Sequence, residues 1–386
     1  MELVAEKYKK SEVGLIPEDW DVDYIKNIAL IKTGSKNTQD RIENGLYPFF
    51  VRSQTVERIN SYSFDGEAIL TAGDGVGVGK VIHYVNEKFD CHQRVYRISN
   101  FASNVNGYFF YLYFSNNFLN RIMQMTAKSS VDSVRMDMIA NMQIPIPPTK
   151  AEQTAIAIAL SDVGALITSL EKLIAKKRNI RKAAMQKLLK PKQGWEIKKL
   201  GEIAEVRDGT HQTPKYVKAG IPFYSVETVT NNSFANTKFI SEEEHKMLTK
   251  SFRIEKGDIL MTRIGSIGDC KLIDWEVNAS FYVSLALLKI KVGVSANYIC
   301  HYSKTEKFKK EADINSLQSA IPRKINLGPI SNIKIKLPDF KEQTRIATIL
   351  SDMDSEIQAL ETKLEKYRNV KLGMMQNLLT GKIRLV

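Results

Sequence analysis

The glycine-rich stretch Gly73–Lys80, with the sequence GDGVGVGK, is the segment of this chain to compare first with a phosphate-binding loop. A phosphate-binding P-loop has a glycine five residues before its last glycine, and a serine or threonine after the lysine. Asp74 and Val81 occupy those two positions here. A similar stretch, Thr262–Gly268, occurs in the second half of the chain. We interpret both as turns whose glycines bring the backbone close to a nucleic acid or to a neighbouring strand of the protein.

Side chains able to read DNA bases gather in segments expected to form exposed loops. Arg, Lys, Asn, Gln, Ser and Thr form hydrogen bonds with base edges. Ordinary solvated surface is the alternative for each of them, and Arg135 and Arg323 are favoured slightly because they occupy similar stretches of the two halves. The candidates in the first half are Arg52, Ser53, Gln54, Lys80, Gln93, Arg94, Lys128, Ser129 and Arg135. The candidates in the second half are Thr210, His211, Gln212, Thr213, Lys215, Arg263, Ser266, Gln318, Arg323 and Lys324.

Motifs for catalysis are missing from the sequence. The run Ile146–Thr149 lacks the polar residue of an Asn/Asp-Pro-Pro-Phe/Tyr methylation motif, and there is no Walker A sequence. Glu361–Lys363 has the spacing of part of a nuclease signature, but it lies in a segment predicted to be an exposed helix. The pairs Cys91-His92 and Cys300-His301 do not supply four ligands at zinc spacings. We therefore expect no metal, no cofactor and no catalytic residue in this chain.

The elements that must position the candidate side chains occur twice. Residues 152–189 and 342–379 align without a gap at an offset of 190, with 18 identities in 38 positions. The segments between the repeated elements differ strongly, as a comparison of residues 36–60 with 212–236 shows. Different loops on a shared scaffold indicate that each copy contacts something different, and neutral drift of surface loops is the alternative.

Each copy ends in a segment with the spacing of a coiled coil. Apolar residues alternate between steps of four and three, which places them on one seam of a helix. A helix of 38 residues would be about 57 Å long. We expect the two helices to pair antiparallel within one chain, and a parallel pairing between two chains is the alternative. The seam residues are Ile156, Leu160, Val163, Ile167, Leu170, Ile174, Ile346, Leu350, Met353, Ile357, Leu360 and Leu364.

The pattern predicts an α/β (α+β) protein with pseudo-two-fold symmetry, in which two similar globular domains are joined by the antiparallel helices. Short β-type runs alternate with turns in the first half, and apolar spacing predicts a helix over Gly107–Gln124 with a counterpart over Ala296–Lys310. Pro145, Pro147 and Pro148 are expected to end the first domain, and Pro338 the second. The predicted boundaries are 1–149 for the first domain, 150–190 for the first helix, 191–340 for the second domain, and 341–386 for the second helix with a C-terminal tail.

Bulk composition narrows the class of partner and the compartment. The chain has 386 residues, enough for two hydrophobic cores. Its net charge of +13 and sequence pI of about 9.3 suit nucleic acid first and an anionic membrane surface second, although a merely basic protein also fits. Three cysteines give no disulfide framework. We expect a soluble protein of the cytoplasm, because we find neither a signal peptide nor an apolar stretch near the roughly 20 residues of a membrane helix.

The order of these motifs resembles that of the DNA specificity subunits of type I restriction–modification systems. The similarity covers essentially the whole chain and rests on ordered duplication, since each motif alone is weak. The opening GLIPEDW is also typical of this family. The motifs are Trp20–Ile25 and Trp195–Leu200, an Ile-x-Ile-Pro or Ile-x-Leu-Pro run, Glu-Gln-x-x-Ile-Ala, Met-Gln-x-Leu-Leu, and Leu378–Arg384 at the end of the second copy.

The resemblance implies a subunit without catalytic activity of its own. Each of its two target-recognition domains would read one half of a split site in double-stranded DNA. The paired helices would fix the gap between the halves and dock two modification subunits, which bind S-adenosylmethionine and methylate adenine. Restriction subunits that use ATP and Mg²⁺ would join the larger complex. The alternatives are a self-contained DNA methyltransferase or nuclease, and a coiled-coil scaffold that binds only protein.

Overall fold

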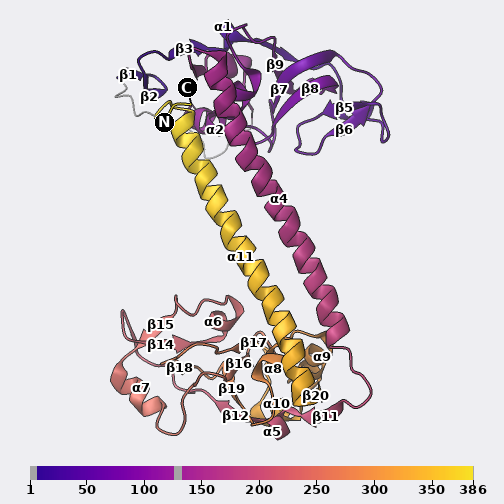
Figure 1. Cartoon of the computed structure of the whole chain (residues 1–386), viewed down its shortest axis with the longest axis vertical. Coiled ribbons are helices and arrows are strands. Elements are labelled where there is room, and N and C mark those ends of the chain that lie inside the picture. The colour runs from indigo at the N-terminus through magenta and orange to yellow at the C-terminus, as the bar shows by residue number, and fades with distance from the viewer. Residues whose placement is uncertain (1–6, 126–132, 386) are drawn as a thin grey trace. The chain divides into compact units, whose positions relative to one another are not determined.

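The computed structural model describes residues 7–125 and 133–385, which form two compact units (Figure 1). The first unit comprises Met1–Lys172 and Thr362–Val386, and the second comprises Leu173–Glu361. Two long helices, α4 (Lys150–Leu188) and α11 (Phe340–Leu378), each contribute a segment to both units.

A twisted β-sheet forms the framework of the first unit. Its central strands are buried because residues 68–72 are apolar or small on both faces of the sheet. Neighbouring strands run antiparallel except β5 and β8, which are parallel. The strand order is β4 (Leu30–Thr33), β9 (Val95–Ser99), β7 (Phe64–Ala72), β8 (Ile82–Cys91), β5 (Tyr47–Phe50) and β6 (Glu57–Ile59).

Helix α2 (Gly107–Gln124) covers this sheet with a row of buried phenylalanines and begins where the sequence predicted. The side chain of Asn106 caps it by accepting a hydrogen bond from the backbone N–H of Phe109 at 2.9 Å. Apolar residues from both long helices complete the same core, among them Ile156 of α4 and Leu378 of α11. Smaller elements are β1 (Tyr8–Ser11), β2 (Gly14–Pro17), β3 (Asp21–Tyr24), α1 (Ile25–Ile28), η1 (Thr38–Asp40), α3 (Met136–Ala140) and β10 (Gln143–Ile146).

One proline expected to end the first domain lies inside a strand. Pro145 is the third residue of β10 and pairs with Val22 of β3. The strand tolerates it because β3 is the only described partner of β10, so one edge of the ladder needs no N–H donor. In the second unit, Pro338 does follow the strand β20 (Lys334–Leu337), as predicted.

The second unit repeats the framework with additions. Its first sheet has the order β12 (Ala204–Asp208), β19 (Leu285–Ile290), β16 (Ile259–Thr262) and β17 (Cys270–Leu272), which corresponds to β4, β9, β7 and β8. A second sheet has the order β13 (Tyr216–Val217), β15 (Lys238–Ile240), β14 (Ile221–Tyr224) and β18 (Ser280–Phe281). The remaining elements are β11 (Glu196–Lys199), α5 (Leu200–Ile203), α6 (Val226–Thr230), α7 (Glu242–Leu248), α8 (Ala296–Ser303), α9 (Glu306–Ile314) and α10 (Leu327–Asn332).

The helix predicted over Ala296–Lys310 is in fact two helices. Helix α8 ends at Ser303, and the side chain of Thr305 then accepts a hydrogen bond from the N–H of Phe308, which starts α9. A threonine that caps a new helix outweighs the apolar spacing that would have continued the old one.

Within each unit, the segments of α4 and α11 pair antiparallel, as expected. In the first unit Arg368 bonds Glu171 at 2.7 Å, and in the second Arg178 bonds Glu361 at 2.6 Å. Of the predicted seam, Ile156, Leu160, Leu170, Ile174, Ile346, Leu350 and Leu364 are buried. Val163, Ile167, Met353, Ile357 and Leu360 are half-buried.

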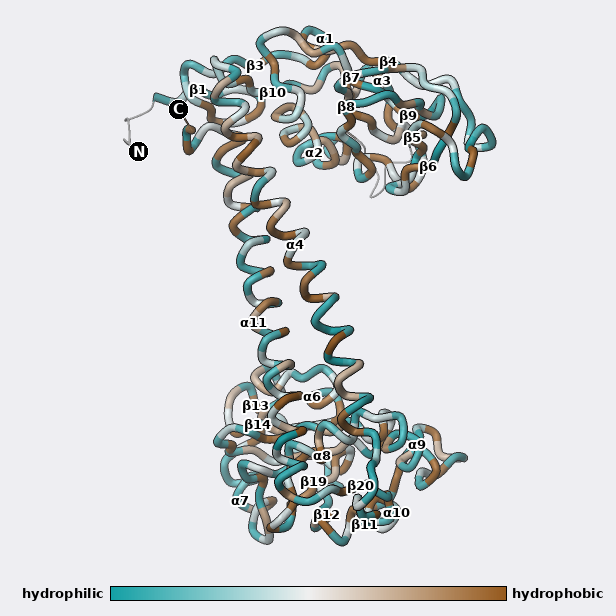
Figure 2. The backbone as a smooth tube through the Cα atoms, turned by 45° about the vertical axis from the view of Figure 1, so that its right-hand side comes forward, coloured by the Kyte–Doolittle hydropathy of each residue, from teal (hydrophilic) through white to brown (hydrophobic). Residues whose placement is uncertain are grey.

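Helix α4 also corrects one expectation from composition. Among the described helices, it alone is long and apolar enough to pass as a membrane-spanning helix by length and composition. Figure 2 shows that polar and apolar residues alternate along it. Its buried apolar residues pack in the cores of the two units, among them Ile156 in the first and Leu189, directly after the helix, in the second.

Candidate DNA interface

Loops from distant parts of the first unit meet where β4, β5 and β7 end and β9 begins. The N–H of Gly73 donates to the carbonyl of Arg94, and the N–H of Val134 donates to the carbonyl of Gly73, both at 2.8 Å. The N–H of Gln93 donates to the carbonyl of Lys36 at 2.8 Å. These backbone bonds bring the loops into contact, so their side chains share one edge of the domain.

Asp74 is the electrostatic centre of this edge. Its two carboxylate oxygens accept hydrogen bonds from the Nη1 atoms of Arg52, at 2.7 Å, and of Arg94. Burial alone would raise the pKa of Asp74, but the hydrogen bonds and charges of the two arginines lower it below its usual range. The carboxylate therefore remains ionised and holds both guanidinium groups in place at neutral pH.

The glycine-rich stretch is a packed turn with an exposed tip. A Cβ atom at Gly77 would lie 2.6 Å from the carbonyl oxygen of Arg52, and one at Gly79 would lie 2.6 Å from Ile122. By contrast, Gly75 has a φ of +78°, and a Cβ atom placed there would meet nothing within 4 Å. The neighbouring Val76 is 97% exposed. The inner glycines thus serve packing, while the tip at residues 75–76 is open to a partner.

The second unit has a corresponding edge with a different polar arrangement. The N–H of Arg263 donates to the carbonyl of Ser284 at 2.9 Å, in the place of the bond from Gly73 to Arg94. The side chain of Arg263 donates from Nη1 to Asp208 at 2.5 Å, and Asp208 in turn bonds Nε2 of His211 at 2.8 Å. A buried arginine, a carboxylate and an exposed histidine therefore form a chain that leads to the surface.

The expectation that Arg263 lies on an exposed loop is wrong. The residue is 6% exposed, and its Nε donates to the carbonyl of Ile325 at 3.1 Å. Asp208 and Ile325 together bind both sides of the guanidinium group. Arg263 therefore holds Asp208 and the neighbouring strand ends together.

Most of the other candidates from the sequence lie on exposed loops of these two edges. Arg323 is half-buried and held by Ser316, Gln318 and Asp313. Thr210 and Ser266 are also half-buried, and Lys128 and Ser129 lie outside the described residues. The exposed candidates are Arg52, Ser53, Gln54, Lys80, Gln93, Arg94, Arg135, His211, Gln212, Thr213, Lys215, Gln318 and Lys324.

Sequence reasoning missed the carboxylates and a basic helix face. The candidates were chosen as hydrogen-bond donors to bases, and this criterion omits Asp74 and Asp208. These carboxylates accept hydrogen bonds from the arginine candidates and hold them in place. Sequence reasoning also passed over Lys309 and Lys310 of α9, which line a hollow of about 580 Å³ beside Ser266. A search for acids close in space to arginines needs the sheet pairing, which the sequence does not supply.

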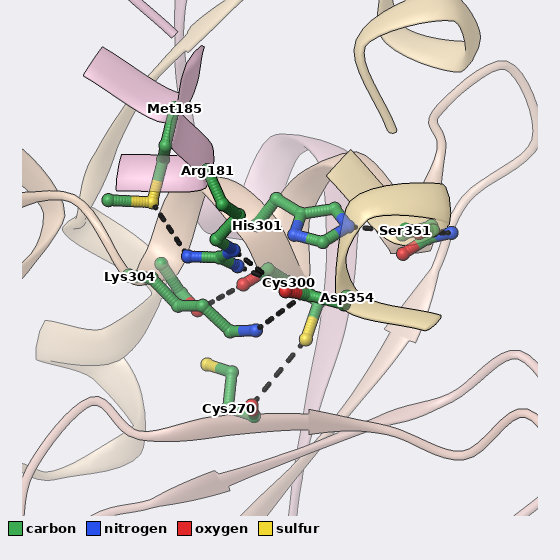
Figure 3. A network of polar contacts seen from close by, with 10 residues as sticks. Arg181, Met185, Cys270, Cys300, His301, Lys304, Ser351 and Asp354 are labelled. Carbon is green, nitrogen blue, oxygen red and sulfur yellow. Dashed lines mark hydrogen bonds and ion pairs between the residues drawn. The ribbon is translucent and has the colours of Figure 1, made fainter. Parts of the chain in front are cut away.

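Both residues of each cysteine–histidine pair are buried and take part in the packing of the protein. Burial raises the pKa of the Cys91 thiol to about 12, and Nδ1 of His92 accepts a hydrogen bond from the N–H of Arg94. Cys300 and His301 belong to a network that holds the end of α4 and the start of α11 against α8 (Figure 3). Within the described ranges, no group of three or more His, Cys, Asp or Glu is arranged to hold a metal ion.

Comparison with known proteins places both halves in one family. The family model described as the type I restriction modification DNA specificity domain matches residues 17–178 and again residues 192–367. The putative type I restriction enzyme MjaX specificity subunit of Methanocaldococcus jannaschii is 25% identical, over 98% of this chain and 97% of its own length. The MjaVIII specificity subunit of the same organism is 26% identical, over 100% of this chain and 98% of its own length.

Solved structures share the fold. The crystal structure of a type I restriction–modification S subunit from M. genitalium has a TM-score of 0.67 and 18% identity, covering 97% of this chain and 99% of that one. A chain from a structural study of complex assembly and conformational transition of the type I R-M system has a TM-score of 0.51 and 14% identity, covering 95% and 99%.

Proposed function

Since this chain belongs to the type I restriction–modification DNA specificity family and is a specificity subunit with two such domains, we propose that each domain binds one half of a bipartite double-stranded DNA site. The observation that supports this assignment is the edge of the first domain at which the loops after β4, β5 and β7 meet the loop before β9. It recurs on the same strands of both domains and gathers most of the exposed candidate side chains.

The two half-sites differ in sequence under this proposal. The first edge presents Arg52 and Arg94 around Asp74, whereas the second presents His211 beside Asp208. Hydrogen-bond donors and acceptors of different types in equivalent places select different bases. The full site is then asymmetric even though the scaffold is duplicated.

The helices α4 and α11 set the gap between the half-sites in this proposal. Each is a single helix of 39 residues, paired antiparallel with the other, and ion pairs such as Arg181–Asp354 at 2.7 Å fix the register. A paired helix is stiff along its axis, so its length can fix a separation on DNA as the half-site spacing does in dimeric readers.

Two modification subunits are the partners that we assign to this chain. Ile180 and Val370 occupy equivalent positions of the two copies, at an offset of 190, and remain 45% and 41% exposed. Equivalent exposed apolar residues on a duplicated scaffold suit two copies of one partner. The partners would bind S-adenosylmethionine and methylate adenine, and restriction subunits would use ATP and Mg²⁺. The specificity subunit itself is the DNA-recognition component, which we place in the cytoplasm without a cofactor.

Reconstitution with modification subunits tests the function. We expect the complex to transfer methyl groups from S-adenosylmethionine to DNA at one asymmetric bipartite sequence, read by sequencing the methylated positions of a genome. The isolated chain should transfer none. Methyl transfer or cleavage by the chain alone would make it an enzyme, and failure of the complex to select any sequence would support a scaffold that binds only protein.

Salt dependence tests the electrostatic part of the proposal. If lysines and arginines of both edges contact phosphates, binding releases counterions, and six to ten contacts predict roughly a 10³- to 10⁵-fold loss of affinity between 50 and 200 mM salt. Fluorescence anisotropy of the complex on a labelled duplex measures it. A flat response over this range would contradict phosphate contacts as the source of affinity.

A further inference from the structure

We infer that Arg52 and Arg94 form a guanine-reading pair in the first domain and that Asp74 is the residue that positions them. This inference rests on the proposed function, because it names what the first edge recognises. The three side chains come from the ends of β5, β9 and β7, so the sheet itself sets their separation.

The pair is exposed while its anchor is not. The side chains of Arg52 and Arg94 are 41% and 60% exposed, whereas that of Asp74 is 19% exposed. Each arginine gives one Nη1 donor to a different oxygen of the carboxylate. Both guanidinium groups are thus fixed at one end and open to solvent at the other.

The remaining donors suit the major-groove edge of guanine. A guanidinium group has five N–H donors, and among the described residues Asp74 is the only acceptor found for either of these two. Two parallel N–H groups match the O6 and N7 acceptors of guanine, which is the commonest specific contact of arginine with DNA. The geometry of each arginine leaves such a fork available.

The shared carboxylate favours a base over a phosphate. Two guanidinium charges and one carboxylate leave a net charge of one on the cluster, and the negative oxygens of Asp74 would repel a phosphate placed beside it. Guanine is neutral, so its binding to arginine depends on the geometry of the hydrogen bonds more than on charge. An exposed lysine such as Lys80 suits a phosphate better.

The backbone holds this arrangement in place. Asp74 forms a β-bridge with Ser133, and the preceding Gly73 is bonded on both sides, to Arg94 and to Val134. The carbonyl of Arg52 lies against Gly77, where any larger residue would displace it. Side chains on a backbone fixed in this way lose little further freedom when they bind a base.

The second domain has no such exposed pair among its described residues. The residues in the places of Arg52 and Arg94, two after β14 and one before β19, are Val226 and Ser284, and the nearby Arg263 is buried and bonded to Asp208. The inference therefore concerns the half-site read by the first domain, and the other half-site is an internal control for the experiment.

The test is the methylation specificity of the complete complex with its modification subunits. The variants are Arg52→Ala, Arg94→Ala, Arg94→Lys and Asp74→Asn, each assayed on a randomised duplex library and on the wild-type site. Lys88→Ala is the matched control, because Lys88 forms a surface ion pair with Asp65 on β7 and β8, where β7 begins, away from the Asp74 end. Thermal denaturation confirms that each variant is folded.

We expect the wild-type complex to require guanine at one or two positions of one half-site. Each arginine-to-alanine variant should lose roughly 10- to 100-fold of that preference, with the other half-site unchanged. Arg94→Lys should lose it as well, because lysine keeps the charge without the fork. Asp74→Asn should relax the same positions while binding non-specific DNA more tightly, since it removes a negative charge.

Several outcomes would overturn the inference without touching the proposed function. One is a half-site that is unchanged in both alanine variants. Another is an equal loss of affinity for all sequences, which indicates phosphate contacts. A third is full retention of specificity by Arg94→Lys. A wild-type complex that methylates no defined sequence would instead contradict the proposed function.

Discussion

Arg384 connects the C-terminal tail to the start of α4 through a nearly buried ion pair. Its Nη2 donates to Glu152 at 2.8 Å, and the Glu152 side chain is 1% exposed. The Glu152 and Asp19 carboxylates outweigh burial and raise the pKa of Arg384. Removing one partner of a buried pair leaves the other charge unsatisfied. Arg384→Ala should therefore lower the free energy of unfolding by about 3 kcal/mol, measured by chemical denaturation.

The matched control is Asp19→Asn. Asp19 accepts two hydrogen bonds from the same guanidinium group at 3.0 Å, but its side chain is 53% exposed. An exposed partner is screened by water, so the loss should stay below about 1 kcal/mol. Equal losses in the two variants would show that burial does not determine the strength of this contact.

His301 should make the second unit sensitive to acid. It is 4% exposed, and burial together with the charge of Lys304 lowers its pKa to about 4, with a smaller contribution from Arg181 and opposition from Asp354. The unfolded chain has the ordinary value near 6.5 and binds the proton more readily. The neutral histidine therefore contributes stability above pH 6.5, and this contribution is lost as the pH falls toward about 4.

Denaturation midpoints of the wild type and His301→Gln between pH 7 and 4 test this contribution. Glutamine can still donate to Ser351, which lies 3.0 Å from Nε2 of the histidine, but it does not titrate in this range. The variant should lose less stability than the wild type over this interval, and the difference should grow below pH 6.5. Parallel curves for the two proteins would contradict a buried neutral histidine.

At the level of residues, the sequence predicted which types of side chain to expect but not which are available. Arg94 and Arg263 were both candidates, because arginine forms hydrogen bonds with base edges. Only the strand pairing places an acid beside each of them, and only packing buries one of the two. Burial of a polar residue depends on neighbours from distant segments, and a single sequence does not contain that information.

At the level of elements, the seam residues at the two ends of the helix pair are more deeply buried than several of those in its middle. Leu350 of α11 is 0% exposed within the core of the second unit, whereas Ile357 is half-buried. Leu350→Ala should cost about 2–5 kcal/mol of stability because it leaves a cavity that its neighbours do not fill. Ile357→Ala should cost less, because solvent already reaches that position. Chemical denaturation of both variants measures the difference, and equal losses would mean that the seam contributes uniformly.

Helices in which the capping residues and the apolar spacing agree were predicted well. Where a capping residue and the apolar spacing indicate different limits, the prediction failed. Helix α2 has both a capping asparagine and a continuous apolar face, so its predicted limits match its observed ones. The apolar spacing of Ala296–Lys310 predicted one helix, yet Thr305 caps a second one that runs to Ile314. The long helices were predicted because 39 residues of regular spacing outweigh any single contrary residue.

At the level of the whole molecule, duplication of the scaffold coexists with difference at the edges. The strand order β4, β9, β7, β8 is repeated by β12, β19, β16, β17, and both edges are joined by equivalent backbone bonds. The side chains on those bonds differ, and among the described strands β13 of the second unit has no counterpart in the first. Shared backbone bonds preserve the place of recognition, while unlike side chains allow each domain to recognise its own half-site.

Shortening both long helices tests whether they set the gap. Residues 164–170 of α4 and 365–371 of α11 are matching stretches, because a Cβ at Gly164 would lie 3.3 Å from Nζ of Lys371. Removing seven residues from each preserves the heptad phase of the seam. At about 1.5 Å per residue the paired helices shorten by roughly 10 Å. With about 3.4 Å of DNA per base pair, the preferred gap should shorten by up to about three base pairs.

Methylation of duplexes with gaps of every length measures this preference, with the half-site sequences held constant. Deleting two residues from each helix is the control, because at 3.6 residues per turn it rotates the following seam residues by roughly 200°, off the contact face, and should abolish the pairing rather than adjust its length. If the seven-residue deletion leaves a folded, active complex with its original gap, the helices do not set the spacing. In that case the contacts of the modification subunits with DNA must determine it.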